Sequence, residues 1–200
     1  MPRPRSKTRD ELVQSAMWVF WENGFEGTSV EDLVSATGVG RGAIYSDFGG
    51  KEELFFACLT EYLETFMAAA IETLRSDAEG LDAISDYFDY FIGLHKKRGM
   101  PGPGCFIANT MTELAPHLVE AREKIEEHME MLRRSFLRSI KQAAKKQNSK
   151  KGDKELNELA RLTVISTQGL WSYARGTSDL TALESFKRSF LTMLEATLGR

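Results

Sequence analysis

Three histidines and two cysteines are the side chains of this sequence best able to act as a base, a nucleophile or a metal ligand. His95, His117 and His128 lie far apart, and no serine or cysteine accompanies them at the spacing of a nucleophile and its base. Glu113 and His117 could bind a metal from one helix face, but Pro116 lies between them and no second ligand pair occurs. We therefore expect no catalytic residue, no metal and no cofactor.

The cysteines are Cys58 and Cys105, without a CxxC pair, so neither a disulfide framework nor a zinc site is expected. Cys105 follows the turn-forming segment 101–104 and opens a predicted helix. In the first turn of a helix, the dipole and the free amide groups favour a thiolate, which would make Cys105 reactive. The alternative is a small buried hydrophobic residue beside Phe106 and Ile107. The sequence leaves both interpretations open.

Charge and hydropathy limit the class of protein. The formal net charge is −3, so the overall basic character typical of nucleic-acid-binding proteins is absent. Residues 1–9 nevertheless hold Arg3, Arg5, Lys7 and Arg9 and no acid, which allows local positive charge. The N-terminus has no apolar run like that of a signal peptide, and no segment is expected to cross a membrane. These features predict a cytoplasmic protein without a membrane partner.

The elements that position these residues are predicted to be helices throughout. Apolar residues recur at spacings of three and four, and prolines are confined to positions 2, 4, 101, 103 and 116. Thr8 with Glu11 and Thr28 with Glu31 have the spacing of capping boxes, and Gly24 and Gly38 are expected helix stops. Nine helices are expected, from Thr8 to Gly24, from Thr28 to Gly38, from Arg41 to Asp47, from Gly50 to about Ser76, and over 81–98, 105–115, 117–147, 154–175 and 180–198.

The second and third predicted helices have the pattern of a helix-turn-helix. They are separated by Gly38-Val39-Gly40, in which Gly38 permits the positive φ of the turn. Ala36 is small, as a close helix crossing requires. In such a motif the first helix lies across the DNA backbone and the second projects side chains into the major groove. We therefore expect a DNA-binding domain over residues 1–50 and a larger helical domain over residues 51–200.

A longer stretch carries a more specific pattern. It contains Gly24-Phe25-Glu26-Gly27-Thr28, then Ala36-Thr37-Gly38-Val39, then Tyr45-x-x-Phe48-x-x-Lys51-Glu52-x-Leu54. Over residues 12–55 the sequence resembles the DNA-binding domain of TetR-family repressors. The resemblance implies a ligand-responsive repressor that binds palindromic double-stranded operator DNA as a homodimer. Asp47 departs from the pattern, because the family often has His or Tyr there, and this puts affinity or register in doubt.

The resemblance also assigns residues to the DNA. It implies a recognition helix whose arginine bonds a guanine edge at two points and whose glycine allows close approach. The residues that it places toward the major groove are Arg41, Gly42, Tyr45 and Ser46. Helix N-termini can offer hydroxyls, amides and a lysine to phosphates. The residues expected there are Thr28, Ser29 and Lys51.

The C-terminal part is expected to hold an apolar effector pocket. Methionine and phenylalanine are concentrated in its helices, and such side chains suit an adaptable apolar cavity. The resemblance implies a small apolar or electrophilic effector between these helices. The alternative is that each of these side chains belongs only to the core. The residues expected near the pocket are Phe66, Phe88, Phe91, Cys105, Asn109, Glu113, His117, Met129 and Trp171.

The last two predicted helices are amphipathic at nearly heptad spacing. In the family, two such helices pair with their copies in a four-helix bundle, so the resemblance implies a homodimer. The alternative is that these stripes only close the core of one subunit. The expected interface residues are Leu159, Thr163, Leu170, Leu183, Phe186 and Phe190.

Two other functions remain compatible with the sequence. A small-molecule-binding protein could keep the TetR-like scaffold and lack specific DNA binding, as Asp47 and the net negative charge would allow. An enzyme could use the apolar pocket, although no catalytic group can be named for it.

Overall fold

A computed structural model describes residues 8–75, 79–99 and 101–199 of the chain. Every regular element within these ranges is a helix, so the prediction of an all-α protein is confirmed. Arg3, Arg5 and Lys7 of the basic N-terminal cluster lie outside the described residues. The elements are α1 (Arg9–Asn23), α2 (Val30–Thr37), α3 (Arg41–Phe48), α4 (Lys51–Tyr62), the π-helical η1 (Leu63–Met67), α5 (Ala68–Thr73), α6 (Leu81–Arg98), α7 (Phe106–Glu113), α8 (Val119–Lys146), α9 (Asp153–Gly176) and α10 (Leu180–Leu198).

The helices agree closely with the predicted ones. The segments α4, η1 and α5 follow one another without a break, and when they are counted as one helix the described residues contain nine. The predicted ranges 81–98 and 180–198 coincide with α6 and α10. The agreement follows from the apolar periodicity, which defines a buried side for each helix.

One helix start differs from the prediction. Thr8 caps α1 in a capping box with Glu11, as expected. The cap of α2 is Ser29, which forms its box with Asp32, whereas the sequence predicted Thr28. The Thr28 side chain is buried instead, and its hydroxyl donates to the carbonyl of Gly24 at 2.6 Å.

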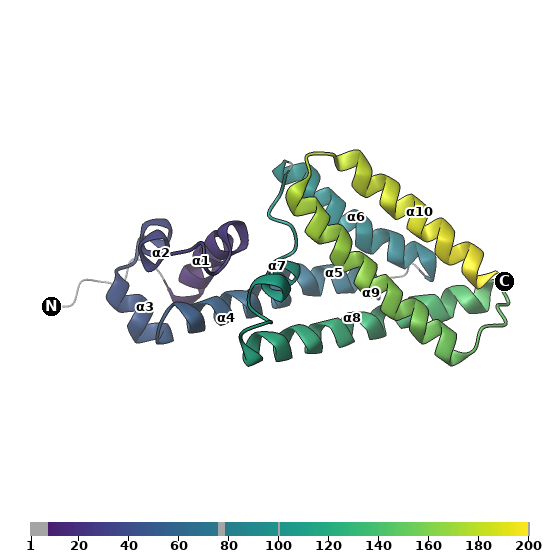
Figure 1. The fold of residues 1–200 in the computed structure, drawn as a ribbon, viewed down its shortest axis with the longest axis horizontal. Coiled ribbons are helices and arrows are strands. Elements are labelled where there is room, and N and C mark those ends of the chain that lie inside the picture. Colours follow the sequence, from purple (N-terminus) through teal and green to yellow (C-terminus); the bar gives the residue numbers. More distant parts are fainter. Residues whose placement is uncertain (1–7, 76–78, 100, 200) are drawn as a thin grey trace.

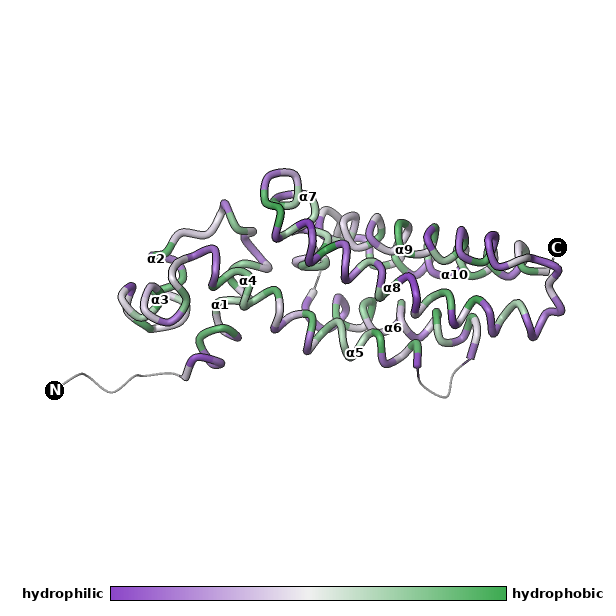
Figure 2. Tube along the Cα trace, turned by 90° about the horizontal axis from the view of Figure 1, so that it is seen from below, coloured by the Kyte–Doolittle hydropathy of each residue, from purple (hydrophilic) through white to green (hydrophobic). Residues whose placement is uncertain are grey.

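The helices form a small unit at one end and a bundle at the other (Figure 1). In the small unit α1, α2 and α3 surround the first turns of α4, and Phe20, Leu33 and Ile44 are fully buried between them. The helix α4–η1–α5 continues into the bundle of α6, α8, α9 and α10, and α7 lies where the two parts meet. Figure 2 shows alternating hydrophilic and hydrophobic bands along α8 and α9, as expected for helices with one buried side.

The α4–η1–α5 helix is more apolar than the sequence analysis recognised. Lys51–Thr73 is long and apolar enough, by length and composition, to cross a bilayer. Half of its most apolar window is buried inside the protein, and it packs against α1 and α6. Its apolar character therefore serves the core of the described structure, as in other central helices.

Candidate nucleic-acid interface and effector domain

The turn between α2 and α3 has the backbone geometry of a helix-turn-helix. Gly38 ends α2 in the left-handed conformation with φ 72°, where a residue with a Cβ would be strained. Val39 is buried within the turn. Ala36 is exposed, so it does not form the helix crossing that the sequence suggested. Thr37 is the buried residue instead, and its hydroxyl donates to the carbonyl of Leu33 at 2.6 Å.

The solvent face of α3 gathers the residues expected in the major groove. Ile44 is fully buried on the inner side of α3, while Arg41, Gly42 and Ser46 are exposed. Tyr45 is 51% exposed, which is unusual for so large an aromatic side chain. The helix therefore presents a guanidinium, a phenol and a hydroxyl to solvent from one short element.

Acidic groups lie close to these side chains. Arg41 forms an ion pair with Glu31 at the start of α2, and both side chains are largely exposed. The Ser46 hydroxyl lies 3.1 Å from Oδ1 of Asp47 and 3.2 Å from the carbonyl of Ala43. Exposed ion pairs contribute only about 0–1 kcal/mol. Arg41 can therefore leave Glu31 for another partner at small cost.

The structure gives Lys51 and Thr28 roles other than the predicted phosphate contacts. Lys51 Nζ donates to the carbonyls of Phe25 and Thr28, each at 2.8 Å. The same ammonium lies 4.0 Å from the centroid of the Phe25 ring. Lys51 thereby fastens the segment between α1 and α2 to the start of α4. Ser29 is exposed at the N-terminus of α2, with its side chain engaged in the capping box.

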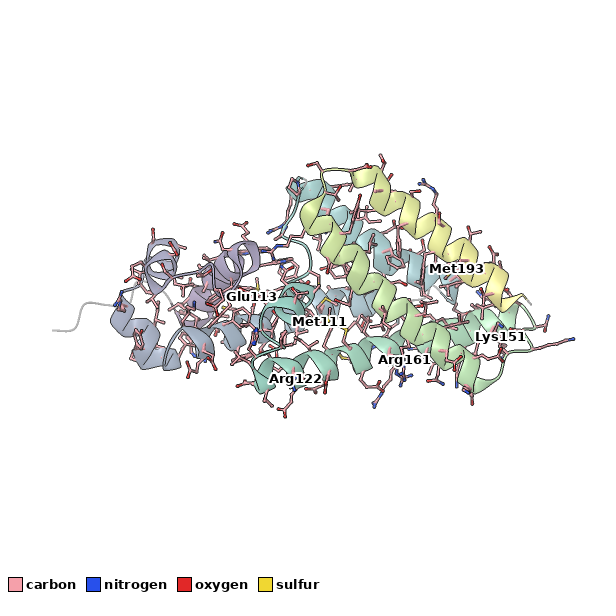
Figure 3. All side chains as sticks on the ribbon, in the orientation of Figure 1. Met111, Glu113, Arg122, Lys151, Arg161 and Met193 are labelled. Carbon is pink, nitrogen blue, oxygen red and sulfur yellow. The ribbon has the colours of Figure 1, made fainter. Side chains whose placement is uncertain are left out.

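A carboxylate from the large domain holds the turn that follows α1. Glu113, at the end of α7, accepts hydrogen bonds from the backbone amides of Phe25 at 3.0 Å and Glu26 at 2.8 Å. Gly24 has φ +81°, and a Cβ there would lie 2.8 Å from Oε2 of Glu113, so this turn requires glycine. The sequence had assigned Glu113 to the effector pocket, whereas it lies at the contact between the two parts of the molecule (Figure 3).

Other contacts at this junction come from the end of α6, the loop before α7 and α7 itself. Trp21 Nε1 donates to the carbonyl of Gly104 at 3.1 Å. Asn109 Nδ2 donates to the carbonyl of Pro103 at 2.8 Å. Arg98 lies over the ring of Trp18 at 3.5 Å. Asn109, expected near the pocket, therefore orders the junction instead.

Cys105 is buried at the same junction. It is the N-cap of α7, and its side chain is 1% exposed. Tyr62 donates its phenol to Cys105 Sγ at 3.4 Å. Burial raises the pKa of the Cys105 thiol, although the hydrogen bonds of Tyr62 and of two backbone amides act in the opposite direction. The net direction is opposite to that of the helix-dipole argument, which favours the description of Cys105 as a buried hydrophobic residue.

Most aromatic residues expected around the pocket are packed against one another. Phe88, Phe91 and Trp171 are buried, and the rings of Phe91 and Trp171 lie 4.8 Å apart. Phe66 stacks on Tyr62 with a centroid distance of 5.7 Å. His117 is exposed. In the described structure these aromatic side chains pack on one another, so their role in lining an effector pocket stays a prediction.

An open groove does exist, and Met129 of the predicted set lines it. The groove has a volume of about 710 Å³ and runs between α7, α8 and α9. Its apolar wall includes Met111, Ile125, Met129 and Val164. The only sign of this groove in the sequence is the pair of apolar stripes on α8 and α9. Periodicity alone assigns such stripes to the core, so it does not predict a groove.

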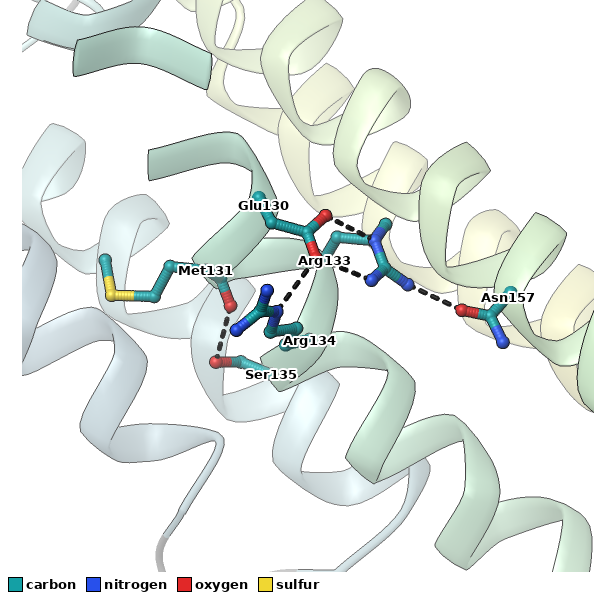
Figure 4. Close-up of polar contacts among 6 residues, drawn as sticks. All are labelled: Glu130, Met131, Arg133, Arg134, Ser135 and Asn157. Atoms are coloured by element: carbon teal, nitrogen blue, oxygen red, sulfur yellow. Dashed lines mark hydrogen bonds and ion pairs between the residues drawn. The ribbon is translucent and has the colours of Figure 1, made fainter. Parts of the chain in front are cut away.

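A charged network borders the groove on α8 (Figure 4). Arg133 forms two hydrogen bonds with Glu130, each of 2.7 Å, and a third with Asn157 of α9 at 2.6 Å. Arg134 also donates to Glu130, at 2.8 Å. Hydrogen bonds from both arginines lower the pKa of Glu130 to about 2. Glu130 is therefore ionised and already paired at neutral pH.

The expected dimer residues are largely buried within one subunit. Thr163 and Leu183 are fully buried, and Leu170 and Phe190 are nearly so. Phe186 stacks on Phe190 with a centroid distance of 5.4 Å, and Leu159 packs against the core. The four buried residues therefore close the subunit's own core, whereas Leu159 and Phe186 are half-buried and their place in an intersubunit face stays a prediction. Large apolar side chains that the same helices do expose are Leu162, Ile165 and Tyr173 on α9 and Met193 on α10.

Comparison with known proteins identifies the two parts of the chain. The family model described as "Bacterial regulatory proteins, tetR family" matches residues 12–58. A model described as "Tetracyclin repressor-like, C-terminal domain" matches residues 80–190, which is more than half of the chain. The chain belongs to the TetR family. Its helix-turn-helix is the DNA-binding unit of a bacterial transcriptional regulator.

TetR-family relatives support the assignment over nearly the whole chain. YezE of Bacillus subtilis (strain 168), an uncharacterized HTH-type transcriptional regulator, is 30% identical over 92% of this chain and 94% of its own length. The HTH-type transcriptional repressor ComR of Escherichia coli (strain K12) is 36% identical over 57% of this chain and 54% of ComR.

Solved TetR-family structures share the fold. A cysteine mutant of the regulator CifR, complexed with double-strand operator DNA, has a TM-score of 0.81 at 23% identity and covers 95% of this chain and 98% of its own. A TetR regulator from Chloroflexus aurantiacus J-10-FL has a TM-score of 0.79 at 24% identity over 93% of each chain.

Proposed function

We propose that this TetR-family protein is a ligand-responsive repressor that binds palindromic operator DNA as a homodimer in the cytoplasm. The observation that carries the proposal is the solvent face of α3, where Arg41 and Tyr45 are exposed on a helix that follows a short, glycine-capped turn. Among the relatives, ComR is described as a repressor and CifR is solved on operator DNA. We assign residues 1–50 to DNA binding and residues 51–200 to effector binding and dimerisation.

In this proposal the α3 side chains read the operator. Arg41 leaves Glu31 and bonds a guanine edge with both arms of its guanidinium. The absence of a Cβ at Gly42 lets the backbone approach the bases, and the Tyr45 phenol contacts the sugar or phosphate beside them. Ser29 and the amides at the start of α2 face a phosphate.

Dimerisation is proposed through the exposed face of α9 and α10. Ile165 is 63% exposed and Tyr173 is 53% exposed on α9, and Met193 is 40% exposed on α10. The two helices lie next to each other in the bundle (Figure 1). Large exposed apolar groups gathered on adjacent helices are typical of an interface. A two-fold dimer would hold two α3 helices at a fixed spacing and so require two operator half-sites.

The test is operator binding by Arg41→Ala, with DNA from upstream of the protein's own gene as the first target. Loss of a bidentate base contact should cost about 1–3 kcal/mol and relax sequence preference at one base position. Arg138→Ala is the matched control, because Arg138 is an exposed arginine of α8. Unchanged affinity and sequence preference in the Arg41 variant would contradict the proposed recognition helix.

A second candidate is a small-molecule-binding protein without specific DNA binding. The observation in its favour is that Glu31 and Asp47 bring negative charge to the α3 surface, and Glu31 already pairs with Arg41. Phosphates would be repelled by these carboxylates at low salt. Specific binding of a palindrome at moderate salt excludes this candidate, and its absence for every upstream fragment supports it.

A further inference from the structure

The groove between α7, α8 and α9 contains a buried polar group that has no partner within the subunit. Gln168 lines the groove and is 5% exposed. Its Oε1 has no hydrogen-bond partner in the described part of the chain. A buried amide oxygen left without a donor has lost its hydrogen bonds to water without replacement, which destabilises the free protein. Oε1 is itself covered, so a donor in the groove reaches it only when the side-chain amide turns toward the groove, and the new hydrogen bond then removes this cost.

The walls beside Gln168 are apolar. Val164 lies one turn before it on α9, and Ile125 and Met129 face it from α8. Met111 completes this surface from α7 (Figure 3). The volume of about 710 Å³ falls within the range of about 300–1,000 Å³ that drug-sized ligands occupy. Methionine side chains adapt to ligands of different shape.

The rim of the groove carries an excess of positive charge. Arg122 and Arg161 lie at the rim on α8 and α9 (Figure 3). Arg133, Glu130 and Glu126 also line the groove. Arg133 and Glu130 neutralise each other, and with Glu126 the lining holds three arginines against two carboxylates. Among the described residues, Arg161 forms no ion pair. A ligand with an anionic end would supply its counter-charge.

We infer that the groove binds a small organic anion with an apolar body and one hydrogen-bond donor. The apolar body lies on Met111, Ile125, Met129 and Val164, the donor bonds Gln168 Oε1, and the anionic end faces Arg161. The inference rests on the proposed function only in its last step, which is that occupancy changes operator affinity. Ile165 lies on both the groove and the proposed dimer face, so a second subunit would flank the bound ligand.

Two fluorescent probes separate the parts of this site. Anilinonaphthalene sulfonate has apolar rings, one N–H donor and an anionic sulfonate, whereas phenylnaphthylamine has similar rings and the N–H without the charge. We expect Gln168→Leu to weaken both probes by about fivefold, the value of one neutral hydrogen bond. We expect Arg161→Gln to weaken the sulfonate by about threefold, as an exposed charge does, and to leave the neutral probe unchanged. Arg138→Gln, an exposed arginine outside the groove, should change neither.

Thermal unfolding distinguishes a ligand-binding role of Gln168 from a structural one. Because Oε1 has no partner in the subunit, Gln168→Leu should unfold at the same or a higher temperature than the wild type. A lower unfolding temperature would show that the amide stabilises the fold, and would overturn the inference. Probe affinities that are equal in wild type and both groove variants would overturn it as well.

Two further measurements separate the groove from the rest of the protein. The oligomeric state of the same variants is measured by sedimentation. If the variants are monomeric where the wild type is a dimer, and still bind the probes normally, then a second copy of the chain occupies the groove and the inference is overturned. Operator binding without probe is measured on the same samples. A wild-type protein that does not bind the operator would contradict the proposed repressor function. The conclusion about ligand binding in the groove would not change.

Discussion

The contact of Glu113 with the turn after α1 links α7 of the C-terminal part to the helix-turn-helix, and it can be broken by one substitution. Glu113→Ala removes the carboxylate that accepts from the amides of Phe25 and Glu26. Lys51 holds the same segment from the other side through two carbonyls. The turn should therefore stay folded in the variant while its position relative to α7 becomes less defined.

The size of the effect can be worked from the two hydrogen bonds. A bond to a charged acceptor contributes about 1.5–3 kcal/mol when buried and less when exposed. Phe25 is partly buried and Glu26 is exposed, so we take about 2 kcal/mol for the pair. If this free energy holds the helix-turn-helix in its DNA-binding orientation, its loss lowers operator affinity by at most about 30-fold. Glu113→Gln retains one acceptor oxygen and should lose about half of the free energy.

The assay is operator affinity by fluorescence anisotropy, with far-UV circular dichroism to show that the variant is folded. Glu123→Ala is the control, since Glu123 is an exposed carboxylate of α8. We expect weaker binding in the order wild type, Glu113→Gln, Glu113→Ala. A folded Glu113→Ala protein with wild-type or higher affinity would refute the reasoning, because the contact would then not hold the DNA-binding orientation.

Three other substitutions test particular contacts. Lys51→Met should lower the free energy of unfolding in urea by about 2 kcal/mol, because it removes two hydrogen bonds and the contact with the Phe25 ring. Lower DNA affinity with an unchanged free energy of unfolding would instead support the prediction that Lys51 contacts a phosphate. Burial lowers the pKa of His128 to about 4, below its unfolded value of about 6.5, so stability should be complete above the unfolded pKa and fall as the pH drops toward 4. His128→Leu should remove about 3 kcal/mol of this pH dependence in urea titrations, and an unchanged slope would exclude a buried neutral imidazole as its source. Ile165→Glu should dissociate the dimer in sedimentation experiments, whereas Val119→Glu, at an equally exposed position on α8, should not; an intact Ile165→Glu dimer would locate the interface elsewhere.

The helices could be predicted because their evidence is local. Periodic apolar residues and glycine stops gave the range of α6 and α10 without reference to any neighbour. The start of α2 could not be decided in this way, because Thr28 with Glu31 and Ser29 with Asp32 have the same capping spacing. The choice depends on the carbonyl of Gly24, which accepts from the Thr28 hydroxyl.

The candidate sites depended on contacts between distant segments, and the sequence could not supply these. Periodicity shows that Thr163 and Leu183 lie on buried faces, but not whether the covering surface belongs to the same subunit or to a second one. Glu113 and Phe25 are far apart in the chain, and no local pattern relates a carboxylate to a backbone amide. The solvent face of α3 was predictable because Arg41 and Tyr45 belong to a family pattern within one short helix.

In the free protein, the Glu31 carboxylate pairs with Arg41 and therefore competes with DNA for the Arg41 guanidinium. Separating the pair costs the same on any duplex, but a correctly placed guanine returns two hydrogen bonds to the guanidinium and most other base pairs do not. The freed carboxylate repels phosphate on every sequence. Both effects are independent of sequence, so they lower the affinity for random DNA and for the operator by the same factor and shorten the residence time on each. On a chromosome with about a million or more competing sites, the acidic neighbour thus trades absolute affinity for a faster search, while the discrimination between sequences stays with the bidentate contact of Arg41.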